Sequence, residues 1–377
     1  MARPPAARIQ RVQPPATLAA GEKARQLARQ GHDVIDLGQS SPHHVTPRHI
    51  IDAGIRALNE GLTNISSSRG LPELRRAMAG KLTVHNDRKV DPDGDILVTP
   101  GSKMGLYDAI NAYIERGDEV LVIEPTWVSF SQQVEMAEGI PVAVPLSEEE
   151  EYYIDYEQLK EYVTPQTRMI VINNPNNPTG PVEEDLLVLC DETYEYFLYD
   201  SNQHLTIANL DGMAERTLTS YTFTKAYSMS GWRLGCIVAQ SALLEPLLKI
   251  QEQTASFVSP FVQMAGVAAL QGPQDHLVQW REDCNELRIR CADRLYQVPG
   301  VHCPLPEGAT FLFPRFSADM TSAELAELLV EREGVVVTPG AGFGESGEGH
   351  FRIALMRSPA DRVLEGVERI ARVLESL

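Results

Sequence analysis

Short apolar runs without polar alternation constrain the fold of this chain more than any other feature. They are rich in β-branched residues and alternate with segments of helical spacing, at residues 96–99, 119–123, 169–172, 186–189 and 235–239. Strands that are apolar on both faces are typical of a mostly parallel sheet covered by helices on both sides. Between the first two runs, apolar residues from Leu106 to Ile114 follow helical spacing, and Gly117 is a plausible end of this predicted helix. We therefore predict a large, doubly wound α/β domain with a mainly parallel sheet.

The character of the sequence changes near residue 274. A long charged helical segment is followed by short apolar runs at 309–313, 334–337 and 351–355 and by a closing amphipathic helix. These patterns predict a smaller α+β domain over 274–377 and a large domain over 45–273. Residues 1–44 are predicted to form an N-terminal arm and part of the small domain. Because Pro4, Pro5, Pro14 and Pro15 disfavour regular helix, the start of this arm is predicted to be extended.

Composition restricts the possible partners and the compartment. The formal net charge of −19 argues against a general nucleic-acid or anionic-membrane binder, because phosphate is bound by clustered Lys and Arg. No run approaches the roughly 18 apolar residues of a membrane span, and the first residues lack the apolar core of a signal peptide. Five cysteines without framework spacing indicate reduced thiols. The sequence thus predicts a cytoplasmic protein that binds neither nucleic acid nor membrane.

The run 220–235 carries the most specific chemical signal. It reads Ser-Tyr-Thr-Phe-Thr-Lys-Ala-Tyr-Ser-Met-Ser-Gly-Trp-Arg-Leu-Gly, so that Lys225 lies among small polar side chains and Arg233 follows eight residues later. A lone lysine suits a Schiff base with an aldehyde cofactor, and an arginine with hydroxyls suits its phosphate. Pyridoxal 5′-phosphate (PLP) also needs an acid at its pyridine nitrogen. Asp191 ends an apolar run, where open α/β sheets bind ligands, although an isolated acid at such a place is more often a helix cap or a solvated turn residue.

Two further motifs accompany these residues, Asn173-Asn-Pro-Asn-Asn-Pro-Thr-Gly180 and Asp191-Glu-Thr-Tyr194. In this order and context the set resembles the fold type I PLP-dependent aminotransferases of class I/II, from about Asp33 to the C-terminus. The resemblance implies an enzyme that moves an amino group from an L-amino acid to a 2-oxo acid by a ping-pong mechanism, through a Lys225 aldimine. It also implies a homodimer with a shared active site.

The resemblance assigns roles to individual residues. Matching catalytic positions are Lys225, Asp191 and Tyr194. The cofactor would be bound by Ser102, Lys103, Trp127, Asn177, Asp191, Tyr194, Thr222, Lys225 and Arg233, and the substrate by Ser40, Asn177 and Arg352. In these roles Trp127 would stack on the pyridine ring, and the planar guanidinium of Arg352 would bind the α-carboxylate through two hydrogen bonds. In one branch of the family a lysine at the place of Lys103 reaches the distal carboxylate of a dicarboxylic substrate, which we take as a hypothesis for this chain.

Alone, several of these residues have simpler interpretations. Trp127 would otherwise be an ordinary core tryptophan, and Arg352 a surface residue of an alternating strand. The cofactor motifs also do not determine which substrate bond breaks. A PLP-dependent carbon–sulfur β-lyase or decarboxylase on the same fold is therefore an alternative, and a PLP-binding module without turnover is a further one.

The sequence departs from the family pattern in the crossover before Asp191. Only ten residues, 181–190, separate Gly180 from Asp191, where the family has a helix and a strand. A parallel crossover usually needs at least about 10 to 12 residues including its helix. Either the chain lacks residues here, or a bare loop makes the connection and leaves an apolar patch of the sheet exposed or covered by a partner.

Two shorter departures concern the rim of the expected site. Ile65 stands where the family usually has a tyrosine that reaches the phosphate from the neighbouring subunit. The run Ser40-Ser-Pro42, followed by His43 and His44, stands where the family more often has Gly-Glu-Pro-Asp and an aromatic residue. Tandem histidines can bind metal, but without a third ligand in view we predict no metal site.

Overall fold

The computed structural model describes residues 4–14, 16–146, 152, 156–173 and 186–377. The largest sheet in these residues has seven strands in the order β2-β8-β7-β6-β5-β3-β4. Strands from β7 to β4 are parallel to their neighbours, and β8 is antiparallel to both β7 and β2. The strands are β2 (Ile96–Thr99), β3 (Glu119–Glu124), β4 (Ile140–Pro145), β5 (Thr167–Asn173), β6 (Leu187–Asp191), β7 (Thr217–Thr222) and β8 (Gly235–Val238). The predicted α/β fold with a mainly parallel sheet is confirmed.

Two strands of this sheet were not predicted from the apolar runs. Strand β4 lies at the edge and is largely exposed, and it carries prolines at its second and last positions, which interrupt the apolar pattern. Strand β7 (Thr-Leu-Thr-Ser-Tyr-Thr) is polar in sequence but lies buried between β6 and β8. Its small hydroxyl side chains fit between packed neighbours, which hydropathy does not reveal.

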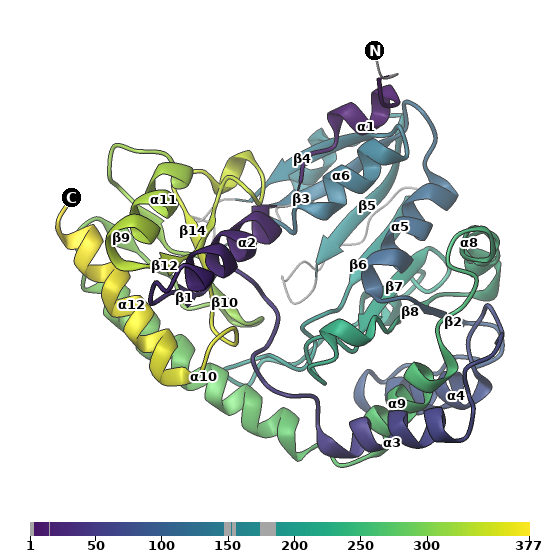
Figure 1. Cartoon of the computed structure of the whole chain (residues 1–377). Helices are drawn as coiled ribbons and strands as arrows, with labels where there is room; N and C mark the ends of the chain where they lie inside the picture. The colour runs from purple at the N-terminus through teal and green to yellow at the C-terminus, as the bar shows by residue number, and fades with distance from the viewer. Residues whose placement is uncertain (1–3, 15, 147–151, 153–155, 174–185) are drawn as a thin grey trace.

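Helices cover both faces of the sheet (Figure 1). On one face α5 (Ser102–Tyr113), α6 (Ser129–Met136) and α8 (Ser241–Gln253) bury the side of β2 that bears Leu97. On the other face Ile96 and Val98 pack with α3 (Arg48–Asn59), α4 (Pro72–His85) and α9 (Pro260–Gln271). This two-sided burial explains why the strand sequences are apolar without alternation.

The crossover from β5 to β6 runs through residues 174–185, which lie outside the described residues. On the strands themselves Ile170, Val188 and Cys190 are buried in a cluster with Ile207 and Met213. The short helices α7 (Tyr156–Glu161) and η1 (Ile207–Asn209) contribute to this cluster. On β5 and β6 as described, the exposed apolar patch expected from a bare crossover is therefore not present.

The second part of the fold surrounds a separate core that packs α10, α11 and α12 against small sheets. Its elements are β9 (Val301–His302), β10 (Phe311–Leu312), β11 (Arg315–Phe316), β12 (Val335–Val336), β13 (Thr338–Pro339), β14 (Phe351–Ala354), α10 (Asp275–Tyr296), α11 (Ser322–Glu333), α12 (Ala360–Glu375) and η3 (Glu345–Gly347). Strand β1 (Ile35–Asp36) pairs in parallel with β12, so the chain before residue 44 contributes to this core. The domain limits at 44/45 and 273/274 stay a prediction.

The N-terminal arm is less extended than its prolines predict. A short helix, α1 (Ala7–Arg11), lies after Pro4 and Pro5, and α2 (Ala16–Arg29) begins directly after residue 15. Proline is tolerated just before a helix because the first turn does not use its missing N–H group. The side chain of Arg11 pairs with Glu135 of α6 at 2.7 Å, which ties α1 to the large sheet. No helix among the described residues has the length and apolar character needed to cross a bilayer.

Candidate active site

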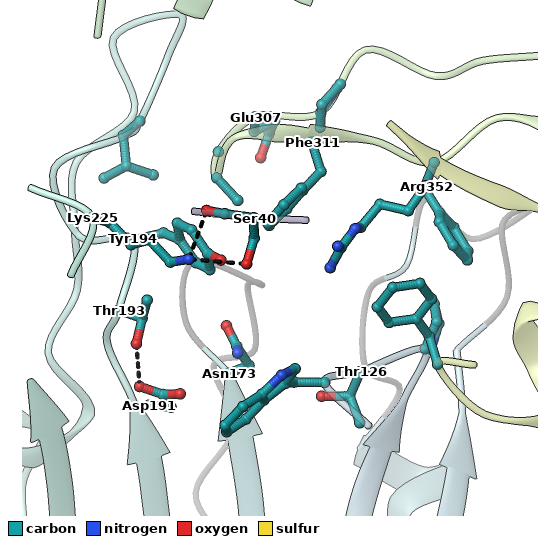
Figure 2. Close-up of a pocket in the computed structure, with 18 of the residues that line it drawn as sticks. Ser40, Thr126, Asn173, Asp191, Thr193, Tyr194, Lys225, Glu307, Phe311 and Arg352 are labelled. Carbon is teal, nitrogen blue, oxygen red and sulfur yellow. Dashed lines mark hydrogen bonds between the residues drawn. The ribbon is translucent and has the colours of Figure 1, made fainter. Parts of the chain in front are cut away.

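A pocket of about 1130 Å³ lies at the carboxyl ends of β5, β6 and β7, and side chains of the smaller part close its other side (Figure 2). Predicted site residues from distant parts of the sequence converge on this pocket. They are Ser40, Ser102, Lys103, Trp127, Asp191, Tyr194, Thr222, Lys225, Arg233 and Arg352. Asn177 lies outside the described residues.

Lys225 follows the end of β7 and is only 8% exposed. Its Nζ donates hydrogen bonds to the backbone oxygen of Ser40 at 2.8 Å and to the Ser40 Oγ at 3.0 Å. Burial, together with the charge of Arg352, lowers the pKa of Lys225 to about 7, although the charge of Asp191 acts in the opposite direction. A substantial share of this amine is therefore neutral near pH 7, so it can act as a base or a nucleophile.

Asp191 ends β6 and is buried at the base of the pocket. Thr193 Oγ1 donates to its Oδ1 at 2.6 Å. Burial raises the pKa of Asp191 to about 6, although the bond from Thr193 and the charge of Lys225 act against this rise. A buried carboxylate of this kind is strongly stabilised by a cationic partner, because the pair removes an otherwise uncompensated charge.

The lowered pKa of Lys225 leads to a titration experiment on the cofactor-free protein. Competitive acetylation, followed by peptide mass spectrometry, should give Lys225 an apparent pKa near 7, with the exposed Lys249 as a reference for reactivity. Asp191→Asn should lower this value because the carboxylate favours the ammonium form, and Arg352→Leu should raise it. An apparent pKa close to the ordinary lysine value of about 10.4 would contradict the assignment.

A buried ion-pair network lies beside the segment that carries Asp191 and Tyr194. The Lys81 Nζ lies 2.5 and 2.6 Å from the two carboxylate oxygens of Glu195. The His204 Nε2 lies 2.9 Å from Glu192, and possible ligand atoms of Glu192, Glu195 and His204 fall within 4.8 Å of one another. Because the Lys81 ammonium already neutralises Glu195, we interpret this cluster as an ion-pair network that holds residues 191–195 in place.

The first turn of α5 forms a corner of the pocket whose donors suit an anion. Gly101, with φ of 80°, precedes Ser102, and a Cβ at Gly101 would lie 2.4 Å from Nη2 of Arg233. A Cβ at Gly235 would lie 2.5 Å from the backbone nitrogen of Ser102. The two glycines therefore allow the Arg233 guanidinium to approach the free N–H groups of the helix start. Helix dipole, N–H groups, guanidinium and the nearby Thr222 hydroxyl together suit a phosphate.

Arg352, on β14, enters the pocket from the side opposite Asp191 (Figure 2). Its Nη2 donates to the backbone oxygen of Gly38 at 2.5 Å, and its guanidinium carbon lies 4.5 and 4.8 Å from the ring centroids of Phe311 and Phe343. Burial lowers the pKa of Arg352 to about 10, and the group stays cationic at neutral pH. A cation fixed between two rings can bind a carboxylate in a defined orientation.

Lys103 and Trp127 lie near each other in the lining of the pocket. The Lys103 Nζ lies 5.0 Å from the centroid of the Trp127 ring system. Burial lowers the pKa of Lys103, and the nearby charge of Arg233 adds to this effect. The Trp127 ring also meets Phe130 edge to face at 5.4 Å, so its plane is held by packing.

Sequence reasoning missed several residues that line the pocket. Thr193, inside the quoted Asp-Glu-Thr-Tyr motif, could have been found from its short hydroxyl beside a carboxylate. Phe311 and Phe343 flank Arg352, but they stand 41 and 9 residues before it in the sequence, and no local pattern marks them. Glu307 reaches the pocket from the loop before β10.

The chain is similar to known proteins over nearly its whole length. The family "Aminotransferase class I and II" matches residues 32–370. The chain belongs to this family. An aspartate aminotransferase of Pyrococcus abyssi is 38% identical over 359 residues, which cover 91% of this chain and 92% of that protein. A probable aspartate/prephenate aminotransferase of Aquifex aeolicus is 36% identical, with 99% of each chain covered.

Solved structures agree with this assignment. The aspartate aminotransferase from Thermus thermophilus with maleate matches with a TM-score of 0.92 at 32% identity, covering 99% of this chain and 100% of that one. An aromatic aminotransferase from Pyrococcus horikoshii matches with a TM-score of 0.87 at 37% identity, covering 94% of this chain and 99% of that one. The protein is thus an aminotransferase, and enzymes of this family generally use PLP.

Proposed function

We propose that this aminotransferase binds PLP at Lys225 and moves the amino group of a dicarboxylic L-amino acid to a 2-oxo acid. One observation carries the proposal. A buried lysine whose pKa lies near neutrality shares a pocket with a buried carboxylate, an anion-binding helix start and a buried arginine. These are the groups that an aldehyde cofactor with a ring nitrogen and a phosphate requires, together with a site for a substrate carboxylate.

The side chains present fit PLP by their chemistry. Asp191 would hold a proton at the pyridine nitrogen, and Tyr194 would donate to the phenolic oxygen, a task that Asn177 would share. Ser102, Thr222 and Arg233 would bind the phosphate at the corner left open by Gly101 and Gly235. Trp127, held by Phe130, would face the ring.

The reaction then depends on three side chains of this protein. When bound, PLP supplies an electron sink that stabilises negative charge at the α-carbon of the substrate. Arg352 binds the α-carboxylate and thereby orients the α-hydrogen. The neutral amine of Lys225 takes this proton and returns it, and it can do so near pH 7 because burial lowers its pKa to about 7. Asp191 keeps the proton at the ring nitrogen.

The charge of the pocket favours an anionic substrate. Among the described residues, its lining contains the cations Lys103, Arg233 and Arg352, the partly neutral amine of Lys225, and the two carboxylates Asp191 and Glu307. The described lining residues thus carry a positive balance, whereas the whole chain has a formal net charge of −19. A related enzyme was solved with maleate, which is a dicarboxylate. These observations support aspartate and glutamate as donors, with Lys103 at the distal carboxylate.

The proposed role of Lys103 predicts a substrate-dependent defect. Lys103→Ala should lower kcat/KM for aspartate and glutamate by about 10- to 100-fold, because one charge-assisted hydrogen bond is lost. The same variant should keep its kcat/KM for phenylalanine, which has no distal carboxylate and serves as the internal control. Steady-state kinetics on the three donors measure this difference. Unchanged kcat/KM values for aspartate and glutamate would show that Lys103 does not bind the distal carboxylate.

The proposed role of Arg352 predicts a general defect. Arg352→Lys keeps the charge but removes the planar fork, and kcat/KM should fall by about 100-fold or more for every amino donor. PLP binding, followed by absorbance, should be retained because the arginine lies on the substrate side. Arg315→Lys, at the exposed position of strand β11, is the matched control. An unchanged kcat/KM for all donors in Arg352→Lys would contradict the assignment.

We also propose a homodimer with a shared active site, by relation to the family. Ile65, at the position where the family usually has a tyrosine that reaches the partner subunit, is 89% exposed. Light scattering measures the oligomeric state.

We propose a cytoplasmic location because all five cysteines are buried free thiols.

The proposed reaction is tested with purified protein and PLP. Aspartate with 2-oxoglutarate should yield oxaloacetate and glutamate in equal amounts, as measured by chromatography. Release of pyruvate and ammonia from a cysteine conjugate, without amino transfer, would favour a carbon–sulfur lyase instead.

A further inference from the structure

Ser40 makes a contact that the usual residue of the family at this position cannot make. The resemblance to the family implies a glycine more often at this position, whereas this chain has Ser40. Its backbone oxygen and its Oγ both accept hydrogen bonds from the Lys225 Nζ, at 2.8 and 3.0 Å (Figure 2). A glycine would leave the backbone oxygen as an acceptor but would remove the hydroxyl.

Two acceptors on one residue have a geometric consequence for the lysine. A neutral amine has two N–H donors and one lone pair. When both hydrogens are donated to Ser40, the remaining tetrahedral position, which holds the lone pair, must point away from Ser40. With the backbone oxygen alone, the amine can rotate about the Cε–Nζ bond among staggered positions, and only some of them leave the lone pair facing the pocket.

The backbone around Ser40 is held on both sides. Before it, the Gly38 oxygen accepts from Thr338 Oγ1 at 2.7 Å and from Arg352 Nη2 at 2.5 Å. After it, Ser41 Oγ donates to Ser230 Oγ at 3.0 Å. The Tyr194 hydroxyl lies within hydrogen-bonding reach of the Ser40 side chain. Ser40 is therefore a fixed acceptor that links two side chains of the site.

We propose that the Ser40 hydroxyl is a positioning residue that orients the lone pair of Lys225 into the pocket. This inference rests on the proposed function, in which the free amine of Lys225 attacks the aldehyde of PLP and moves the substrate proton. It adds a task for the side chain of Ser40 that is separate from substrate binding by this segment.

The test measures how fast the cofactor-free protein captures PLP. Condensation of the Lys225 amine with the aldehyde releases one water and changes the absorbance, so stopped-flow spectroscopy follows it directly. The rate constant is recorded against pH, and its limit at high pH reports the fully neutral amine. Competitive acetylation gives the pKa of Lys225 separately in each variant.

Ser40→Ala should lower the high-pH limit by about three- to tenfold, because one orienting hydrogen bond is lost. The pKa of Lys225 should fall in the same variant, since the lost acceptor stabilised the ammonium form. The two effects change the rate of PLP capture near pH 7 in opposite directions. The lost orientation slows capture, whereas a lower pKa of Lys225 by itself would speed it. Ser40→Thr, which keeps the hydroxyl, should restore both values. Ser41→Ala removes a tether of the same loop but no contact with Lys225, so it should change both values less than Ser40→Ala does.

An unchanged high-pH limit in Ser40→Ala would overturn the inference, and so would an equal loss in Ser41→Ala, which would indicate a displaced loop. Either result leaves the proposed function intact, provided that the wild-type protein captures PLP at Lys225. Failure of the wild-type protein to do so, shown by borohydride trapping and peptide mapping, would instead refute the proposed function.

Discussion

Lys225→Ala should lower kcat by about 10⁴-fold or more, the largest effect that we expect in this protein. Alanine has neither a nucleophile for the aldehyde nor a base for the α-proton, and no other lysine donates to Ser40 at the same place. Initial rates with aspartate and 2-oxoglutarate measure the loss. PLP should still bind, because the side chains proposed for its phosphate and ring nitrogen remain.

Two controls separate chemistry from folding in this experiment. Circular dichroism and thermal unfolding should show a folded variant, since removal of a buried lysine relieves the desolvation that lowers its pKa. Borohydride trapping should label the wild-type peptide that contains residue 225 and leave the variant unlabelled. Turnover of Lys225→Ala at the wild-type rate would refute the proposed mechanism.

Asp191→Asn should lower kcat by about 10²- to 10³-fold while the protein stays folded. Asparagine is almost the same size and can still form a hydrogen bond, but it has no negative charge to hold a proton at the pyridine nitrogen. The electron sink at the substrate α-carbon is weakened as a result. Single-turnover kinetics under saturating aspartate isolate this step from product release.

Asp108→Asn is the matched control for Asp191→Asn. Asp108 is a buried carboxylate of α5 outside the pocket lining, and burial raises its pKa to about 7. Asp108→Asn should change kcat by no more than about twofold, because Asp108 does not line the pocket and its substitution affects only local packing and stability. Wild-type kcat in Asp191→Asn would exclude the carboxylate from the reaction, whereas equal losses in both variants would indicate a general effect of removing a buried charge.

Much of the fold follows from local sequence patterns. The five apolar runs are strands β2, β3, β5, β6 and β8, because strands buried on both faces need apolar residues at successive positions. Strand β7 was missed, since its threonines and serine are buried only through the neighbours that β6 and β8 provide. Likewise, the helix α1 forms between prolines that predicted an extended arm, and its contact with α6 depends on residues more than 100 positions away.

The candidate site, like the fold, has some features that the sequence predicted and others that required the structure. The identities of Lys225, Asp191, Arg233 and Arg352 and their motifs were sufficient to predict that these side chains share one pocket, because the chemistry of a side chain is a local property. The pKa of Lys225 near 7, the rings beside Arg352 and the contact between Ser40 and Lys225 came only from the tertiary structure. Burial, charge–charge interaction and hydrogen-bond geometry depend on distances through space. The sequence alone determined which groups this aminotransferase contains, and the folded chain decided how close they lie and how strongly each one is perturbed.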